Sequence, residues 1–250
     1  MSREYTHEIK LEADQAAVWA ALTEAGELGR WLVEVARVEP RVGGVYELNF
    51  GDGVQLQSHI ETWEPGRHLR IFGPGPIIQE YTLEKDGEST TLRVVTSGIP
   101  DSPGWDGFVE GGRRGWEISL RGLLHNLQHH RGQARQMTRL RFDTPLAVAD
   151  SWERATGALR LGSDLDAALL VSVAGFGLLA EITKLDRALL ALGIQPTSAG
   201  SQVWLALSTY ASRFPPADTV EQWSRQLEQT LAVAPVGTTR QNLQELHGHG

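Results

Sequence analysis

The sequence predicts an α+β fold in which a curved antiparallel sheet wraps around a long C-terminal helix, with this arrangement present twice in tandem. Three observations lead to this prediction. Short runs of alternating apolar and polar residues recur between residues 45 and 97, joined by turns too short for a parallel crossover. An apolar stripe at helical spacing follows them, from Trp116 to Leu127. The second half repeats this order with fewer strands.

The composition is that of a globular protein. The 250 residues are enough for one large domain or for two of about 125 residues, and 41% of them are hydrophobic. The sequence has no cysteine, which excludes disulfides, thiolate nucleophiles and cysteine-ligated metals and agrees with the cytoplasmic location that we expect. The formal net charge is −8 without a basic cluster, so we expect no nucleic-acid partner.

The sequence predicts no membrane span. The first ten residues are polar, unlike a signal peptide. The longest apolar run, 167–180, is shorter than the ~20 residues that a spanning helix needs. It contains Gly175 and Gly177, so we interpret it as two buried strands that meet at a glycine bend.

The elements expected in the first half begin with a strand at Tyr5–Leu11, followed by a helix over 16–23 that Asp14 can cap. A loop with Trp31 and Pro40 comes next. The strands of the meander are then expected at 45–50, 54–63, 69–72, 78–85 and 90–97.

The closing helix of the first half is expected over 106–130, with Gly132 as a stop. Its stripe of Trp116, Leu120, Leu123, Leu124 and Leu127 would pack on the sheet. A curved sheet with a long helix across its concave face is the natural way to bury both apolar surfaces.

The second half contains segments that resemble segments of the first. Thr138–Phe142 resembles His7–Leu11, Trp152–Thr156 resembles Trp19–Thr23, and Ile182–Gly193 resembles Ile60–Gly73. A last helix is expected from Pro215 to Leu231, with Val220, Trp223 and Leu227 at helical spacing. The alternative is an unrelated α+β appendix.

The domain boundaries that follow are 1–132 for a complete unit, 133–236 for an abbreviated second unit and 237–250 for a flexible tail. The second unit lacks one hairpin, so we expect its cavity to be smaller or filled.

A series of short motifs in a fixed order connects residues 1–130 to a known family. They are Val18–Thr23 in the first helix, Arg41–Tyr46 with its double glycine, Trp63–Leu69 around a hairpin, Thr91–Pro100 in the last strand and Gly115–Trp116 in the closing helix. With these motifs the first half resembles the START-like superfamily called SRPBCC, in the branch named after activators of the Hsp90 ATPase. Residues 134–236 resemble a degenerate second copy. The resemblance implies a helix-grip fold that encloses an apolar cavity.

Other motifs favour structural roles. Gly43 and Gly44 precede a strand, and no P-loop lysine follows them. His125 and His129 have a two-ligand helical spacing, but they lack an acidic third ligand nearby in the sequence. No Gly-x-Ser-x-Gly elbow is present, and Glu61 and Glu64 occupy exposed positions. We therefore expect no metal, no cofactor and no nameable catalytic residue.

The candidate site is a cavity between the sheet and the closing helix. Trp31, Tyr46, Tyr81 and Trp116 are predicted to point inward, where they either fill a solid core or line a ligand cavity with one or two hydroxyl groups. Gly111, Gly112 and Gly115 fit either a mobile lid or close helix–sheet packing. The residues predicted to line the cavity are Trp31, Tyr46, Leu48, Ile60, Ile71, Tyr81, Leu83, Val94, Trp116, Leu120 and Leu123.

Three functions are consistent with these observations. The first is binding of a small apolar molecule or lipid in the first unit, without assigned chemistry. The second is a chaperone-regulating interaction module that acts through surface contacts. The third is a cyclase- or hydrolase-like enzyme that uses Tyr46 or Tyr81 as an acid. An open cavity would favour the first and third, and a broad apolar patch the second.

Overall fold

The structure is a computed structural model that describes residues 2–51, 53–159, 166–211, 216–233 and 236–242. These residues form two compact units, which divide between Gly132 and Gln133. Within the described ranges, every helix is too short or too polar for a membrane-crossing segment.

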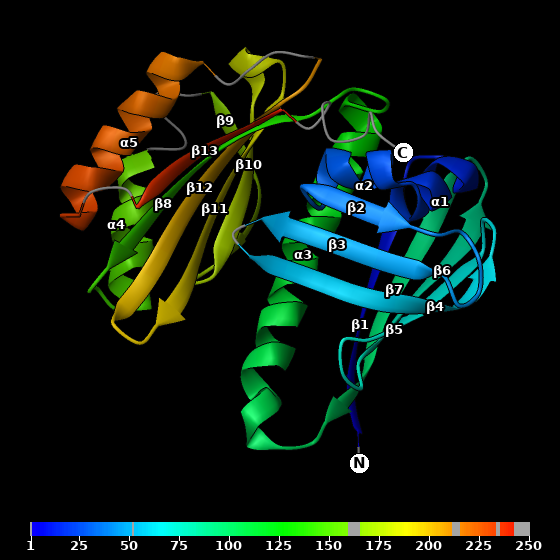
Figure 1. Ribbon diagram of the computed structural model, residues 1–250. Helices are drawn as coiled ribbons and strands as arrows, with labels where there is room; N and C mark the ends of the chain where they lie inside the picture. The colour runs from blue at the N-terminus through cyan, green and yellow to red at the C-terminus, as the bar shows by residue number, and fades with distance from the viewer. Residues whose placement is uncertain (1, 52, 160–165, 212–215, 234–235, 243–250) are drawn as a thin grey trace. The chain divides into compact units, whose positions relative to one another are not determined.

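Unit 1, residues 2–132, contains a seven-stranded antiparallel sheet in the order β1-β7-β6-β5-β4-β3-β2. Its α3 crosses one face of this sheet (Figure 1), so the predicted α+β helix-grip fold is confirmed. Its elements are β1 (Ser2–Leu11), α1 (Gln15–Thr23), α2 (Ala25–Trp31), β2 (Val35–Val38), β3 (Val45–Gly51), β4 (Val54–Glu64), β5 (His68–Phe72), β6 (Ile78–Asp86), β7 (Ser89–Pro100), η1 (Pro103–Trp105) and α3 (Asp106–His129).

Local signals set the helix ends of unit 1. The Asp14 carboxylate accepts a 2.8 Å hydrogen bond from the backbone N–H of Ala17, which confirms the predicted N-cap of α1. The closing helix α3 ends at His129, and Gly132 beyond it has a φ of +75°. Leu120, Leu123 and Leu127 of its stripe are buried against the sheet and the first helices.

The predicted loop around Trp31 and Pro40 is wrong in part, because it contains α2 and β2. Both elements are short, and tertiary contacts hold them. Leu28 of α2 is fully buried, and the indole N–H of Trp31 donates a 2.8 Å hydrogen bond to the carbonyl of Ala21. Such short elements leave little periodicity in the sequence.

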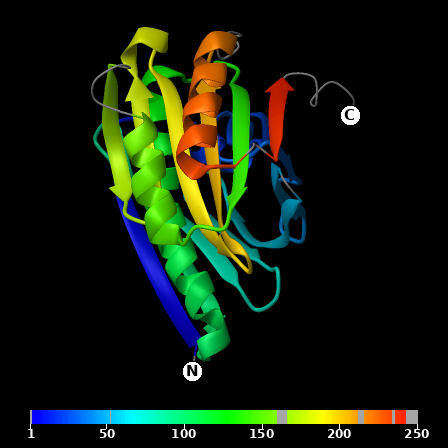
Figure 2. The same ribbon diagram turned by 90° about the vertical axis from the view of Figure 1, so that its left-hand side faces the viewer.

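Unit 2, residues 133–242 of the described chain, has a six-stranded antiparallel sheet in the order β13-β8-β12-β11-β10-β9. The helices α4 and α5 lie side by side on one face of it (Figure 2). The elements are β8 (Gln136–Thr144), α4 (Val148–Leu159), β9 (Ala167–Val173), β10 (Gly177–Ile182), η2 (Thr183–Leu185), β11 (Ala188–Thr197), β12 (Gly200–Thr209), α5 (Ala217–Leu231) and β13 (Gly237–Asn242).

Two sequence expectations for unit 2 need correction. The apolar run 167–180 forms a hairpin at Gly175 as expected, but only β10 is buried. The other strand, β9, is an edge strand of the sheet, and Leu169 is 57% exposed. Residues 237–242, expected to begin a flexible tail, form β13 and pair with β8, while 243–250 lie outside the described residues.

The two sheets share a strand order. In each unit the first strand pairs with the last strand of the meander, as β1 pairs with β7 and β8 with β12. The described meander of unit 2 is one hairpin shorter. When the two sheets are aligned on β7 and β12, β10 and β11 correspond to β5 and β6. The predicted match of 182–193 with 60–73 instead pairs them with β4 and β5, so it is wrong by one strand. The common order is compatible with a duplication, which stays a prediction.

Candidate functional site

A cavity of about 630 Å³ lies in unit 1 between the sheet and the first half of α3. Strands β1 and β3 to β7 form its wall on the sheet side, and η1 and α3 form the other side. The turn around Gly73–Gly75 also borders it. The aromatic residues of its lining are Tyr5, Tyr46, Phe50, Tyr81, Trp105, Phe108 and Trp116.

The strand residues reach the cavity through the two-residue alternation of a pleated sheet. On β3, Tyr46, Leu48 and Phe50 all line it, because every second side chain points to the same face. On β6 the same spacing places Gln79 beside Tyr81. The described residues of the lining include no Asp, Glu, Lys, Arg or His, so no ionisable group other than a phenol faces the cavity.

Most polar groups on the sheet side of the cavity are occupied by hydrogen bonds within the protein. The Tyr46 hydroxyl donates to the carbonyl of Leu22 at 2.8 Å, and Ser58 Oγ donates to the carbonyl of Gly73 at 2.7 Å. Burial raises the pKa of Tyr46 well above the usual tyrosine value.

A second chain of hydrogen bonds runs along β6 and β7. The Thr96 hydroxyl donates to Oε1 of Gln79 at 2.8 Å, and Nε2 of Gln79 donates to the carbonyl of Val95 at 3.0 Å. The Tyr5 hydroxyl lies beside that of Thr96. Burial raises the pKa of Tyr5, and the interaction with the Thr96 hydroxyl partly offsets this effect.

Tyr81 differs from these residues. Its side chain is buried, and its ring packs edge-to-face on Trp116 with 5.9 Å between the ring centroids. Among the described residues its hydroxyl has no hydrogen-bond partner. Its pKa lies well above the usual tyrosine value, first because of burial and then because the phenols of Tyr46 and Tyr5 are close. At neutral pH the cavity therefore contains an uncharged, unpartnered O–H donor.

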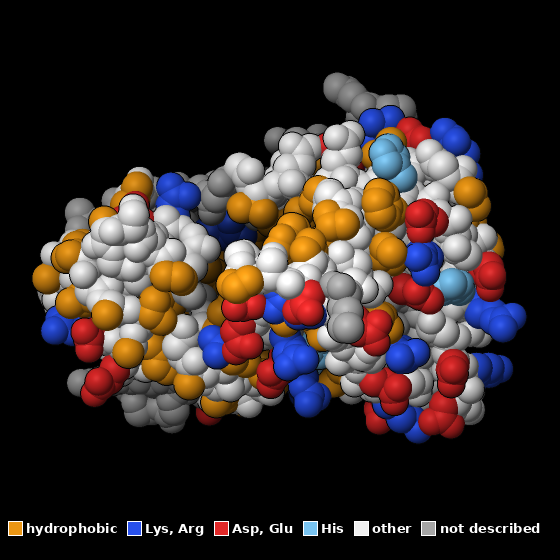
Figure 3. Space-filling view, turned by 90° about the horizontal axis from the view of Figure 1, so that it is seen from below, with side chains coloured by type: hydrophobic (Ala, Val, Ile, Leu, Met, Phe, Trp, Pro, Cys, Tyr) orange, Lys and Arg blue, Asp and Glu red, His pale blue; other side chains and the backbone are white. Residues whose placement is uncertain are grey.

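The mouth of the cavity is apolar. Leu56 of β4 and Phe108 of α3 both line it, and they are 38% and 42% exposed. Phe108 packs edge-to-face on Trp105. Figure 3 shows hydrophobic side chains among charged ones on one face of the molecule.

Two glycines of α3, Gly112 and Gly115, line the cavity. A side chain at Gly112 would collide with the Tyr5 hydroxyl, so close packing of helix and sheet explains that glycine. Gly115 faces open space, and Gly111 does too without lining the cavity. The mobile lid stays a prediction from the sequence.

The structure brings together five of the eleven predicted lining residues, namely Tyr46, Leu48, Ile71, Tyr81 and Trp116. The other six lie in the surrounding core and not in the cavity lining: Trp31, Ile60, Leu83, Val94, Leu120 and Leu123. They face inward as predicted, but side chains of the core fill the space around them. Leu83, for example, lies two residues beyond Tyr81 on β6, which also contacts α1.

Several lining residues were not predicted. Continuing the alternation would have found Phe50 after Leu48 and Gln79 before Tyr81. Tyr5 also shares its inward face with Leu11, which is buried. No sequence signal placed Trp105 and Phe108 at the mouth, because their positions depend on where α3 begins relative to the sheet.

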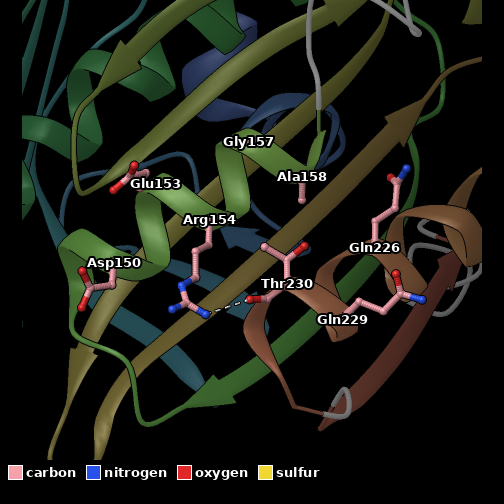
Figure 4. Close-up of a pocket in the computed structure, with 8 residues that line it drawn as sticks. All are labelled: Asp150, Glu153, Arg154, Gly157, Ala158, Gln226, Gln229 and Thr230. Carbon is pink, nitrogen blue, oxygen red and sulfur yellow. Dashed lines mark hydrogen bonds between the residues drawn. The ribbon is translucent and has the colours of Figure 1, made fainter.

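A second hollow, of about 770 Å³, lies in unit 2 between α4 and α5 (Figure 4). Its side chains are largely polar and exposed, including Asp150, Glu153 and Gln229. Arg154 crosses it to donate a 3.3 Å hydrogen bond to the carbonyl of Thr230. Among the described residues that line this groove, none carries a buried, unpartnered polar group like that of Tyr81.

The comparisons with known proteins agree with the sequence motifs. Residues 12–128 match the model of the family described as "Activator of Hsp90 ATPase homolog 1-like protein". The matched range lies within unit 1, and the resemblance predicted from its motifs is confirmed. None of the curated proteins matches the chain.

Some solved structures that are similar to this chain cover about half of it, and one covers most of it. Protein MLL2253 from Mesorhizobium loti is 22% identical, with 51% of this chain and 98% of that chain covered and a TM-score of 0.46. The Aha1 dimer from Colwellia psychrerythraea is 19% identical, with 52% and 99% covered and a TM-score of 0.47. DynU16, from the dynemicin biosynthetic locus, is 18% identical, with 91% and 94% covered and a TM-score of 0.45.

Proposed function

We propose that unit 1 binds a small hydrophobic molecule in the cavity between its sheet and α3. The observation that supports this most directly is the cavity itself, with a volume of about 630 Å³ and a lining dominated by aromatic and aliphatic side chains. Small-molecule sites commonly have volumes of about 300–1,000 Å³ and combine an apolar wall with few polar groups.

The energetics support the same proposal. Protein cores are close-packed, and the side chains around an empty space lose contacts that a ligand could restore. An apolar ligand that covers the rings of Phe50, Tyr81 and Trp116 would gain roughly 25 cal/mol for each Å² removed from water. The exposed Leu56 and Phe108 give such a ligand an apolar route into the cavity.

Binding without chemistry is favoured over catalysis by a cavity tyrosine. General acids work best when their pKa lies near the working pH, and burial raises the pKa values of Tyr46 and Tyr81 instead. The described lining contains no carboxylate or imidazole that could act as the complementary base.

A chaperone-regulating contact remains the second candidate, because the family description names activators of the Hsp90 ATPase. The two functions predict different results with purified components. If chaperone regulation is the function, adding this protein should stimulate the ATPase of Hsp90. The ligand-binding proposal expects no stimulation.

The cavity can be tested by filling it from α3. Replacing Gly115 with leucine places a side chain in open space within the cavity and favours the helix by about 1 kcal/mol. The matched control is Gly111→Leu, since Gly111 also faces open space on α3 but does not line the cavity.

The readout is the fluorescence titration of a neutral, solvent-sensitive dye such as Nile red. We expect one dye per chain for the wild type and for Gly111→Leu, and affinity at least ~10-fold weaker for Gly115→Leu, which corresponds to about 1.4 kcal/mol. Circular dichroism confirms that both variants are folded. Equal binding by both variants would show that the dye does not occupy this cavity.

A further inference from the structure

We infer that the ligand of this cavity is an uncharged molecule that carries a carbonyl oxygen and accepts a hydrogen bond from the Tyr81 hydroxyl. The inference rests on the proposed function and narrows the class of ligand. It combines two observations, the absence of charged side chains from the described lining and the unpartnered phenol of Tyr81.

The lining selects against ions. A charged group that leaves water must be paired or hydrogen-bonded inside the protein. No Asp, Glu, Lys, Arg or His is among the described lining residues, so neither a carboxylate nor an ammonium group of a ligand would find a counter-ion there. The rings of Tyr46, Tyr81 and Trp116 instead favour an uncharged apolar body.

The hydrogen-bonding groups select the polar end of the ligand. Tyr46, Ser58 and Thr96 use their hydroxyl protons on acceptors of the protein. Tyr81 is 2% exposed, and its hydroxyl keeps a proton with no acceptor among the described residues. Buried polar groups normally have a partner, so an acceptor from the ligand would complete this one.

The position of the Tyr81 hydroxyl fits this role. The phenols of Tyr46 and Tyr5 act electrostatically on it, and both of these residues also line the cavity, so the three phenols lie near one another along the wall. The Tyr5 hydroxyl lies beside that of Thr96. The other donors of the lining, the Ser119 hydroxyl and the indole N–H groups of Trp105 and Trp116, belong to half-buried residues of η1 and α3.

A ketone or ester oxygen matches this wall better than an alcohol or an acid. A carbonyl brings two lone pairs and no proton, so it satisfies Tyr81 without needing an acceptor in return. An alcohol or a protonated acid would bring a further proton that also needs an acceptor, and Oε1 of Gln79 already accepts the Thr96 hydroxyl proton.

Three fluorescent dimethylaminonaphthalene probes of nearly equal size test the inference. One carries a propionyl ketone, one a propyl group and one a carboxylate. We expect the ketone to bind the wild type ~10-fold more tightly than the propyl probe, which is the scale of one added hydrogen bond. We expect the ionised carboxylate probe to bind at least as weakly as the propyl probe.

The decisive variants are Tyr81→Phe and its matched control Tyr46→Phe. The ketone's advantage over the propyl probe should disappear in Tyr81→Phe and persist in Tyr46→Phe, because the Tyr46 hydroxyl is already bonded to Leu22. The emission of the bound ketone, which shifts to the red when its carbonyl accepts a hydrogen bond, should shift to the blue only in Tyr81→Phe.

The outcomes separate the two levels of the proposal. Equal loss of ketone and propyl binding in Tyr81→Phe, or tight binding of the carboxylate, would overturn the inference and leave the ligand-binding function standing. Failure of all three probes to bind the folded wild type would overturn the function and the inference together. Thermal unfolding of each variant shows that it is folded.

Discussion

The Tyr46 hydroxyl on β3 donates a 2.8 Å hydrogen bond to the backbone carbonyl of Leu22, one residue from the end of α1. This bond joins the cavity wall to the first helix, and both Tyr46 and Leu22 are buried. Of the two tyrosines that the sequence offers as an acid or a ligand contact, Tyr46 is therefore used by the fold, whereas the buried Tyr81 has no hydrogen-bond partner in the described structure.

Removing each phenolic hydroxyl should affect stability differently. Tyr46→Phe leaves the Leu22 carbonyl buried without its partner and should lower the free energy of unfolding by about 1–3 kcal/mol. Tyr81→Phe removes a buried hydroxyl that has no partner among the described residues and should leave stability unchanged or slightly higher. Urea unfolding of the full chain measures both, and a larger loss for Tyr81→Phe would contradict the assignment.

Two neighbouring residues of the α3 stripe, Trp116 and Leu120, should respond differently to truncation. Leu120 is 4% exposed in the core, so Leu120→Ala should cost about 2–5 kcal/mol of stability. Trp116 is half-buried beside existing empty space, so Trp116→Ala should cost less stability but weaken dye binding. Leu169→Ala, at an exposed edge position, is the control and should change neither. A Trp116 variant that binds dye normally would place the ligand elsewhere.

The stability of unit 1 should fall in mild acid because of His7. Burial lowers the pKa of His7; nearby Glu117 opposes this and Arg113 adds to it. The folded protein then binds fewer protons than the unfolded chain below pH 6.5, so stability decreases as the pH falls through this range. The buried Nε2 of His7 has no hydrogen-bond partner in the described structure, which agrees with a neutral ring.

Replacing His7 with phenylalanine should reduce this acid sensitivity. Urea midpoints at pH 7 and pH 5 should differ less for His7→Phe than for the wild type, because the phenyl ring cannot take up a proton. His59→Phe, at an exposed residue of β4, is the control and should keep the wild-type difference. An unchanged pH dependence in His7→Phe would assign the effect to other groups.

Two neighbouring glycines of α3 should differ when replaced by alanine. Gly111→Ala should stabilise the helix by about 1 kcal/mol, since its side chain meets open space. Gly112→Ala should lose this gain or destabilise the protein, because its methyl group would collide with the Tyr5 hydroxyl. Tyr5→Phe should restore stability to Gly112→Ala in the double variant. Without such rescue, the glycine would serve a purpose other than helix–sheet packing.

Local sequence signals were sufficient for the framework of the fold. The alternation along β3 to β7, the Asp14 cap and the stripe of α3 are short-range patterns, and burial of one face enforces each of them. The strands β3 to β7 and the helices α1 and α3 begin and end close to the bounds predicted from the sequence. The family resemblance followed from the same segments, and residues 12–128 match it.

The sequence alone determined which side chains of unit 1 face inward, and the tertiary structure decided which of them meet empty space. An inward residue such as Leu83 or Leu123 touches other side chains, whereas Tyr81 and Leu48 reach the cavity, and the paths of the helices α1 and α3 over the sheet make this difference. The same reason applies to hydrogen bonds. Tyr46 finds its acceptor 24 residues away along the chain, and Tyr81 finds none among the described residues, because a side chain's partners depend on distances in space that a periodic pattern does not encode.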